Sequence, residues 1–582
     1  MLSQFRNIFT VTVLAILLAG VSFSNVALGQ EESRYNEVFD SNGQVREHYQ
    51  GIIAQWANRV HHMQTYEAQT YQQFKRGKQD SNAINDLPRM IPKVEYDEMV
   101  KGVHQRERAI QAFLHDHYSG VKLYDGAGVI SKELVHSIIV RNGEDGYQNI
   151  LNGQSPMNFL YGPDLIRGPN GIFYALEDNL GFVGGFGDIV LAQEISEKLY
   201  PEIAKQYDYV KAIDFYHQLL ARYRQQASQF GGKLVFYSDP HATDDSEEIR
   251  TMELFSRLGI EVLSPKSNRK FSYEAEGVFV QDRDGQHREK VGFIILNLEH
   301  ADADLSHPAV REKAILDNAA GFVSDKKEGP KALRLKVLEN LLKYDPTKKD
   351  KVADLKNLMF LLKDTGYRVT SSHGMRENKG LNDAILGGRV GSSYTPGAEF
   401  VGDKQIYTYM EKFIRFYLHE EPIIRNVETY MLNIPGTQKI DDQILDKIFG
   451  TDRKGENFRN WVIKPVDGRG GEGIIFGSQT KASDIPGIIE KMKESPHKLQ
   501  VQRNTPPSMM PGNRIIDTRA LTYSTKQGAI VSPVPWSRAA TADRSLLINV
   551  SAGGAVVPVF VTAKKAKGSP VISCEKLFAS GF

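Results

Sequence analysis

A short polar segment of the sequence has residue types that suit a hard metal ion. Glu177, Asp178 and Asn179 follow one another, and Asp164 lies upstream of them. Carboxylate oxygens are preferred ligands of Mg²⁺, which in proteins commonly bridges them to nucleotide phosphates. On a β-strand, Glu177 and Asn179 would share one face and Asp178 would point to the other. Asp164, Glu177 and Asn179 therefore form a candidate metal-ligand set; the alternative is a polar strand end without a ligand.

A second candidate is the glycine-rich segment 461–477, in which Lys464 follows an apolar run. The segment formally matches GxGxxG, but a dinucleotide site needs a helix to begin at the glycines. Here Ile474, Ile475 and Phe476 follow and favour a strand. We predict a strand-loop-strand flap whose backbone N–H groups can lie over phosphates, because glycine permits close approach. A glycine-rich hairpin without a ligand is the alternative.

Two arginines follow this flap, Arg519 in Ile-Asp-Thr-Arg and Arg538 in Trp-Ser-Arg. The planar guanidinium binds phosphate or carboxylate oxygens in a bidentate manner. Each arginine is a candidate for stabilising charge on a transferred γ-phosphoryl group or for holding a substrate carboxylate. For Arg538 a structural ion pair is the alternative. Segment 501–504, which lies between the flap and these arginines, is predicted to be a strand that presents backbone groups to an adenine edge.

The order of these motifs resembles the ATP-grasp superfamily: a lysine, a glycine flap, a hinge strand, Asp-x-Arg, a further arginine, and Asn549 with a Gly-Gly pair. In an uninterrupted ATP-grasp order, an Asp and then Glu-x-Asn would follow. Here these elements are found upstream, which indicates a circular permutation. Further details, such as Gly402-Asp403-Lys404, are similar to the circularly permuted ATP-grasp type 2 family. The resemblance extends from about residue 124 to 560.

The resemblance implies an α/β (α+β) protein: a circularly permuted ATP-grasp fold with a Rossmann-like pre-ATP-grasp domain and peripheral helices. It implies ATP and Mg²⁺ as cofactors. The catalytic residues that it implies are Arg519 and Arg538. The metal ligands that it implies are Asp164, Glu177 and Asn179. The nucleotide-binding residues that it implies are Lys404, Lys464, Gly468, Gly470, Gly471, Gly473 and Gln502.

The activity implied by the resemblance is a carboxylate-amine ligase that makes an amide or peptide-like bond through an acylphosphate. Small-molecule or peptide carboxylates and amines would be its substrates. Two departures weaken this implication: Val183-Gly184-Gly185 replaces the usual Pro-Ser-Gly, and Ala555 stands after the late Gly-Gly pair where a lysine is expected. The alternatives are an exported non-catalytic nucleotide- or ligand-binding module and an ATP-dependent phosphotransferase.

The composition narrows the class of protein. The 582 residues include 72 Lys+Arg and 71 Asp+Glu, a formal net charge of +1, and 41% hydrophobic residues. A nearly neutral chain without a basic stripe is not expected to bind nucleic acid. The length allows two or three packed domains. Cys574 is the only cysteine, so no intrachain disulfide can form.

The pattern along the chain predicts its organisation. Residues 1–29 resemble a signal peptide, with Arg6 before an apolar stretch, so we expect an exported, periplasmic or secreted protein without a transmembrane helix after signal removal. The oligomeric state is not predicted. The predicted parts are 30–230 for N-terminal helices and the permuted metal-ligand part, 231–325 for the pre-ATP-grasp-like domain, 326–385 for a helical insertion and 386–582 for the nucleotide-binding lobes.

Three local expectations can be compared with the structure. Polar, aromatic-rich residues 34–118 are predicted to form surface helices, and 193–228 to form two helices divided near Pro201. Residues 233–237, 245–258 and 260–263 are predicted as strand, helix and strand of a parallel sheet. Residues 277–281 and 290–297 flank a turn-rich sequence and are predicted to form a hairpin.

Overall fold

The structure, a computed structural model, describes most of the chain from residue 34 to residue 564. The described ranges are 34–60, 74–75, 83–142, 144, 147, 157–181, 183–238, 246–264, 267–297, 379–434, 437–466, 473–542, 546–550 and 554–564. The predicted signal peptide and nearly all of the predicted insertion at 326–385 lie outside these ranges. Within them, no helix has the length and apolar character needed to cross a membrane.

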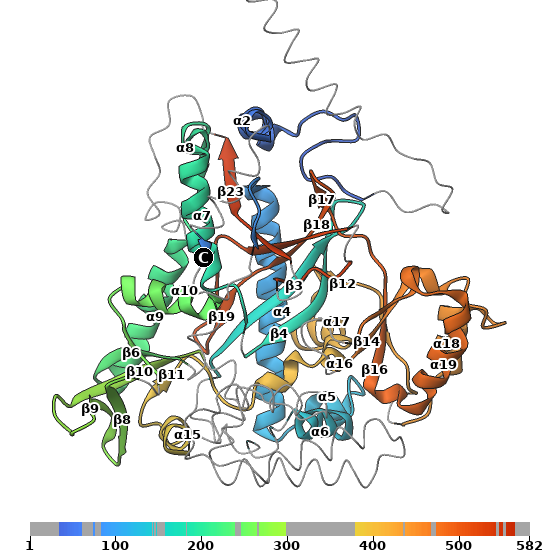
Figure 1. Ribbon diagram of the computed structural model, residues 1–582. Coiled ribbons are helices and arrows are strands. Elements are labelled where there is room, and N and C mark those ends of the chain that lie inside the picture. Colours follow the sequence, from blue (N-terminus) through green and yellow to red (C-terminus); the bar gives the residue numbers. More distant parts are fainter. Residues whose placement is uncertain are drawn as a thin grey trace, which may run out of the picture.

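A ten-stranded sheet forms the centre of the molecule and joins segments that are far apart in the sequence (Figure 1). Its central strand β3 (Phe159–Arg167) pairs antiparallel with both β4 (Phe173–Leu180) and β18 (Arg514–Arg519). β18 also pairs antiparallel with β21 (Trp536–Thr541). The upstream and downstream motifs therefore share one sheet, as the predicted permutation requires. The other strands of this sheet are β1 (Ala83–Ile84), β12 (Arg425–Asn426), β17 (Met509–Met510), β19 (Thr522–Ser524), β20 (Ile530–Val531) and β22 (Ala555–Val557).

A second, six-stranded sheet lies on one side of this centre (Figure 1). Strands β6 (Lys233–Ser238) and β7 (Glu261–Leu263) are parallel and are connected through α10 (Ser246–Arg257), which confirms the predicted strand-helix-strand unit. The predicted hairpin is also confirmed, since β9 (Gly277–Asp282) and β10 (Glu289–Asn297) are antiparallel. The remaining strands are β8 (Arg269–Glu274) and β11 (Gly391–Ser392), and α15 (Lys379–Leu386) packs on this sheet.

A small lobe on the opposite side of the central sheet carries the glycine-rich segment (Figure 1). Its four strands are arranged in the order β13 (Thr429–Met431), β16 (Leu499–Arg503), β14 (Trp461–Pro465) and β15 (Ile475–Phe476). β14 and β15 are antiparallel, so the predicted strand-loop-strand flap is confirmed at its two strands. Helices α18 (Asp442–Phe449) and α19 (Ile485–Glu494) pack their apolar faces on these strands.

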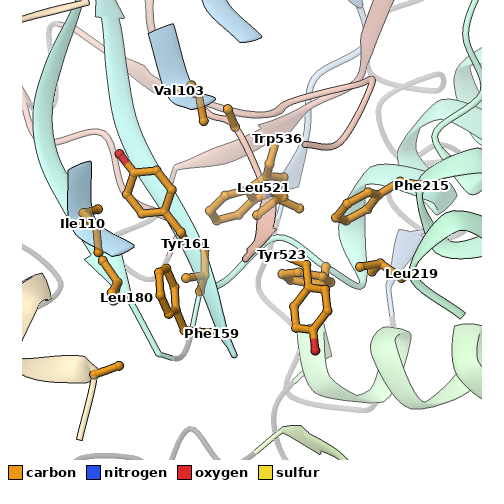
Figure 2. Packing of buried hydrophobic residues seen from close by; sticks show 14 of the residues in the cluster. Val103, Ile110, Phe159, Tyr161, Leu180, Phe215, Leu219, Leu521, Tyr523 and Trp536 are labelled. Atoms are coloured by element: carbon orange, nitrogen blue, oxygen red, sulfur yellow. The ribbon is translucent and has the colours of Figure 1, made fainter. Parts of the chain in front are cut away.

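Helix α4 (Lys93–Ser119) corrects the prediction that residues 34–118 form surface helices. It begins after Pro92 and ends at Gly120, whose φ of 82° allows the left-handed end of the helix. Half of its residues are buried, and Val103 and Ile110 pack with Phe159 and Tyr161 of β3 in the main core (Figure 2). The helix thus packs against one face of the central sheet and is not a surface helix.

The helices after the central hairpin also differ from the prediction of two helices over 193–228. There are three, α7 (Asp188–Leu199), α8 (Pro201–Gln206) and α9 (Ile213–Phe230), with the short strand β5 (Tyr207–Tyr209) between the last two. Pro201 begins α8, because proline fits the first helical turn, where its missing N–H has no partner to lose. β5 pairs with β23 (Val559–Lys564), which pairs with β2 (Arg89–Pro92).

The remaining described helices are short or peripheral. They are α2 (Gln50–Val60), α5 (Leu123–Gly126), α6 (Lys132–Arg141), α16 (Lys404–Tyr407) and α17 (Met410–Phe413), with single turns at Glu47–Tyr49, Glu399–Gly402, Ile414–Leu418, Phe458–Asn460, Gly477–Gln479, Ala482–Asp484 and Pro496–Lys498.

Candidate functional site

The β3–β4 hairpin brings the predicted metal ligands together. Asp164 is paired with Glu177 and Gly162 with Asn179 in the register of the two strands. The Asn179 amide donates to the Gly162 carbonyl at 3.2 Å and lies 3.5 Å from Glu177 Oε1, so Glu177 and Asn179 share a face as predicted. Asp178 points to the other face of β4, into the core.

Arg519 lies on β18, next to this hairpin, and Arg538 lies on β21, one strand further away; both bind the Asp164 carboxylate. Arg519 is opposite Asp164 in the sheet and donates from Nε and Nη2 to its two oxygens, at 2.6 and 3.0 Å. Arg538 Nη2 donates to Asp164 at 2.9 Å and to Asp517 at 2.5 Å. The two predicted catalytic arginines therefore meet at one predicted metal ligand, and the ion pair considered for Arg538 is present.

The buried charges of this cluster shift one another's pKa. Burial alone would raise the pKa of Asp164, but the neighbouring Arg519 and Arg538 outweigh it and hold that pKa well below its usual range. Burial alone would lower the pKa of Arg538, but the negative charges of Asp164 and Asp517 outweigh burial, so the pKa of Arg538 is raised. For Asp517, burial and the negative Asp164 prevail over Arg538 and raise its pKa from 3.8 to about 6.

The raised pKa of Asp517 predicts a pH dependence of stability that Asp517→Asn removes. Between pH of about 4 and 6 the folded chain binds a proton at Asp517 that the unfolded chain has lost, so this group lowers the free energy of unfolding as pH rises. The shift corresponds to about 2–3 kcal/mol across that window. Urea unfolding at several pH values should show that the free energy of unfolding of the variant rises relative to that of the wild type as pH rises. Parallel curves would contradict the prediction.

Two lysines approach the same carboxylates from other elements. Lys404, the first residue of α16, lies 3.1 Å from Glu177 Oε2, and both side chains remain partly exposed. Lys464 of β14 donates to Gln502 Oε1 at 2.5 Å. Burial, with the positive Lys404 nearby, lowers the pKa of Lys464 to about 8 despite the attraction of Glu177. Burial raises the pKa of Glu177, but Lys404 and Lys464 outweigh it, so that pKa is lowered.

The lowered pKa of Lys464 predicts that binding of a polyphosphate at this site weakens in alkaline solution. Above pH of about 8 the side chain loses the charge that attracts phosphate oxygens. We expect the affinity for ATP to fall about tenfold between pH 7 and 9, and Lys464→Arg to remove most of this fall, because arginine stays charged. Isothermal calorimetry measures it, with the exposed Lys454→Arg as the matched control. An unchanged profile in Lys464→Arg would contradict the prediction.

The structure describes some of the other predicted nucleotide-binding residues and not others. The side chain of Gln502 is buried and donates to the Leu176 carbonyl at 3.1 Å and to Thr429 at 3.0 Å. Gly473 has a φ of 71°, which suits glycine at the return of the flap. Gly468, Gly470 and Gly471 lie outside the described residues. The nucleotide roles of all these residues stay predictions.

The prediction missed an aromatic side chain that supports both arginines. The guanidinium carbons of Arg519 and Arg538 lie 5.2 and 4.9 Å from the Trp536 ring centre. The indole N–H of Trp536 donates to Asp188 at 3.1 Å, which fixes the ring. A β-carbon at Gly185 would lie 2.6 Å from this ring, so the glycine that this chain shares with the Pro-Ser-Gly pattern gives Trp536 its room. Only the Trp-Ser-Arg sequence hinted at this neighbour.

A second missed group supports the metal-ligand strand from behind. Arg106 of α4 donates to both oxygens of Asp178, at 3.0 and 2.6 Å, and to Asn426 at 2.9 Å. Tyr161 also donates to Asp178, at 2.7 Å. Since Asp178 lies between Glu177 and Asn179, this buried ion pair fixes the strand that carries both. No signal in the sequence linked Arg106 to Asp178.

The donor set fits Mg²⁺ better than a softer metal. Among the described residues there is no group of three or more His, Cys, Asp or Glu side chains arranged to hold a metal ion. The set at the hairpin is instead two carboxylates and one amide, all hard oxygen donors. Glu177 and Asn179 are its more open members, whereas the arginines enclose Asp164.

Two family profiles match this chain on segments that contain part of the site. The family described as a circularly permuted ATP-grasp matches residues 366–502, which contain Lys404 and Lys464. The family described as circularly permuted ATP-grasp type 2 matches residues 88–246, which contain the hairpin carboxylates. The chain belongs to the circularly permuted ATP-grasp proteins. The matched segments thus carry the two lysines and the hairpin carboxylates, whereas Arg519 and Arg538 lie outside them.

Relatives of this circularly permuted ATP-grasp chain are distant. An uncharacterized protein of Mycobacterium tuberculosis is 24% identical over 557 residues, which are 92% of this chain and 85% of that protein. A protein of Frankia casuarinae with the provisional name glutamate–cysteine ligase 2-2 is 23% identical, over 80% of this chain and 45% of its own length. A glutathione synthetase-like effector from Globodera pallida has a TM-score of 0.43 and 9% identity, over 82% of this chain and 90% of that one.

Proposed function

We propose that this chain is an ATP- and Mg²⁺-dependent carboxylate-amine ligase. The observation that supports it best is the convergence of four cationic side chains on one carboxylate-rich hairpin: Lys404, Lys464, Arg519 and Arg538. Such an arrangement can neutralise a polyphosphate and a substrate carboxylate at the same place, which is the main electrostatic task of phosphoryl transfer. The provisional ligase name of the Frankia relative agrees with it.

The hairpin residues are the proposed holders of Mg²⁺. Glu177 and Asn179 would bind the ion from one face of β4, with Asp164 on the neighbouring strand. When bound, Mg²⁺ neutralises phosphate charge and orients the γ-phosphoryl group. Lys404 now pairs with Glu177, so it stands where it can exchange that carboxylate for a phosphate oxygen. Asp164 keeps the two arginines in place.

The proposed reaction has two steps. A substrate carboxylate oxygen attacks the γ-phosphorus of ATP, the bond to the bridging oxygen breaks, and ADP leaves with an acylphosphate formed. An amine then attacks the acyl carbon, loses a proton, and displaces phosphate to give the amide. Arg519 and Arg538, steadied by Trp536, hold the acid and the transferring charge; Lys464 and the flap hold the nucleotide. No covalent protein nucleophile takes part.

A binding module without catalysis is the second candidate. Ala555 opens β22 where a lysine is expected after the Gly-Gly pair, so the central sheet has one cation fewer there. A phosphotransferase would use the same nucleotide site with a hydroxyl acceptor. The three functions differ in ADP release. A ligase releases ADP when an acid and an amine are present, a phosphotransferase when a hydroxyl acceptor is present, and a binding module releases none.

The experiment is ADP release by the full chain with ATP, Mg²⁺ and panels of carboxylic acids, each with and without amines. Release that requires both an acid and an amine, with amide found by mass spectrometry, supports the ligase. Release with a hydroxyl acceptor alone identifies a phosphotransferase. Nucleotide binding with no release for any panel member would overturn the ligase in favour of the binding module. The Lys464→Met variant is the background control, and Lys454→Met its matched surface control.

Export through residues 1–29 is part of the proposal. Expression in a bacterium followed by fractionation and N-terminal sequencing tests it, because cleavage near residue 29 gives a shortened chain outside the cytoplasm. A full-length chain in the cytoplasm would remove this part and leave the ligase proposal intact.

A further inference from the structure

We propose that the six-stranded sheet carries a second ligand site, for a small anion with a planar aromatic ring. A cavity of about 440 Å³ opens on this sheet, within the size range of small-molecule sites. The lining residues used below are Tyr237, Phe271, Tyr273, Lys270, Arg283 and Ser267. The inference goes beyond the ligase function and does not depend on it.

The cavity lies where open α/β sheets bind ligands. Tyr237 is next to the last residue of β6, and Leu263 is the last residue of the parallel strand β7. Ligands of such sheets bind outside the carboxyl ends of the strands. β8 is at the other edge of the sheet, and Ser264 and Ser267, which lie between β7 and β8 in the sequence, line the cavity together with residues of these strands.

Aromatic rings form the apolar wall of the cavity. The ring centres of Tyr237 and Phe271 are 5.1 Å apart with planes at 76°, and those of Phe271 and Tyr273 are 6.1 Å apart. Phe271 and Tyr273 are two apart on β8, so both project from the same face of the sheet. A planar ring can contact these rings by offset or edge-to-face packing.

The cations of the cavity differ in what they already bind. Arg269 is neutralised by Glu261 and Glu289, both at 2.8 Å, and Asp282 at 3.4 Å. Lys270 and Arg283, in contrast, make no ion pair in the part of the chain that the structure describes, and both are exposed at the cavity. Arg283 donates to the Ser267 carbonyl at 3.2 Å, which uses one of its five N–H groups. The lining of the cavity therefore includes an aromatic wall and two cationic residues that have no carboxylate partner among the described residues.

This site is separate from the nucleotide site. Strands β8 and β9 form the outer end of the six-stranded sheet, whereas β14, which carries Lys464, lies on the far side of the central sheet (Figure 1). A ligand in the cavity would not reach the hairpin carboxylates. The chemistry of the wall and the two cations favours an aromatic carboxylate over an aliphatic acid or an aromatic amine.

The test is calorimetric titration of the full chain, without nucleotide, with phenylacetate, cyclohexylacetate and benzylamine. We expect phenylacetate to bind, cyclohexylacetate to bind several-fold more weakly for want of a planar ring, and benzylamine not to bind. Lys270→Glu/Arg283→Glu should weaken phenylacetate binding about tenfold or more. Phe271→Leu should remove the preference for phenylacetate over cyclohexylacetate while keeping the charges.

Lys439→Glu/Lys526→Glu is the matched control, because both lysines are exposed and lie on other sheets or loops. It should leave phenylacetate binding unchanged. Absence of phenylacetate binding at millimolar concentration, or equal binding by the Lys270→Glu/Arg283→Glu and control variants, would overturn the site. Since no ATP is present, neither result bears on the ligase proposal, which the ADP-release experiment tests by itself.

Discussion

Replacing Glu177 and Asn179 together by alanine is expected to abolish the Mg²⁺-dependent stabilisation of the chain by ATP. A ligand at a hundred times its Kd stabilises the folded state by about 2.7 kcal/mol, and we expect nearly all of this to disappear. The reason is that these two side chains are the open oxygen donors of the β3–β4 hairpin. Thermal unfolding with and without ATP and Mg²⁺ measures the effect.

The variant should itself remain folded, because Glu177 and Asn179 are only half-buried and contact Lys404 and the Gly162 carbonyl rather than the apolar core. Glu276→Ala/Asn42→Ala removes the same side-chain types from exposed positions and should behave as the wild type. If the Glu177→Ala/Asn179→Ala variant is stabilised by ATP and Mg²⁺ as strongly as this control, the hairpin is not the metal-nucleotide site.

Asp164→Ala is expected to lower the free energy of unfolding by about 3–5 kcal/mol at neutral pH, because removal of one partner leaves buried charges uncompensated. Arg519 would lose the carboxylate that it binds with two nitrogens, and Arg538 would lose one of the two carboxylates that it binds and keep Asp517. The pKa of Asp164 is lowered in the folded chain. Its contribution is therefore complete above its unfolded pKa of about 3.9 and is lost as pH falls below it.

Urea unfolding at neutral pH and at successively lower pH measures this prediction. The difference between wild type and Asp164→Ala should shrink in acid. Asp97→Ala is the surface control, since Asp97 forms a half-exposed pair with Lys93 at 2.7 Å and should change stability by less than about 1 kcal/mol. An Asp164→Ala variant as stable as the Asp97→Ala control at pH 7 would show that the arginines find other partners and that the cluster is not tightly coupled.

The sequence predicted the parts of the site that depend on local spacing. Alternation along a strand placed Glu177 and Asn179 on one face and Asp178 on the other, and the structure agrees. The strand after the glycines was predicted from Ile475 and Phe476, and it pairs with β14. The order of motifs also indicated that Asp164 and Arg519 belong to one sheet, although they are 355 positions apart.

The position of α4 could not be predicted from its own residues. Gln105, Arg106 and Glu107 give the helix a polar stretch that is typical of a surface, yet all three are buried. Their partners come from other elements: Arg106 binds Asp178, and Glu107 accepts a hydrogen bond from Ser524. The pattern of polar and apolar residues shows which side chains of a helix are polar. It does not show whether a polar side chain contacts water or a partner that is distant in the sequence.

The pairing of β3 with β18 has a consequence for folding during synthesis. Synthesis produces β3 and β4 more than 330 residues before β18, so for most of translation the hairpin has an open edge where its arginine-bearing neighbour will later lie. Unpaired edges invite pairing with other chains, and non-local pairing of this kind slows folding. A nascent or truncated chain that stops before residue 514 would hold Asp164 without either of its counter-charges. Assembly of the site is thereby tied to completion of the chain.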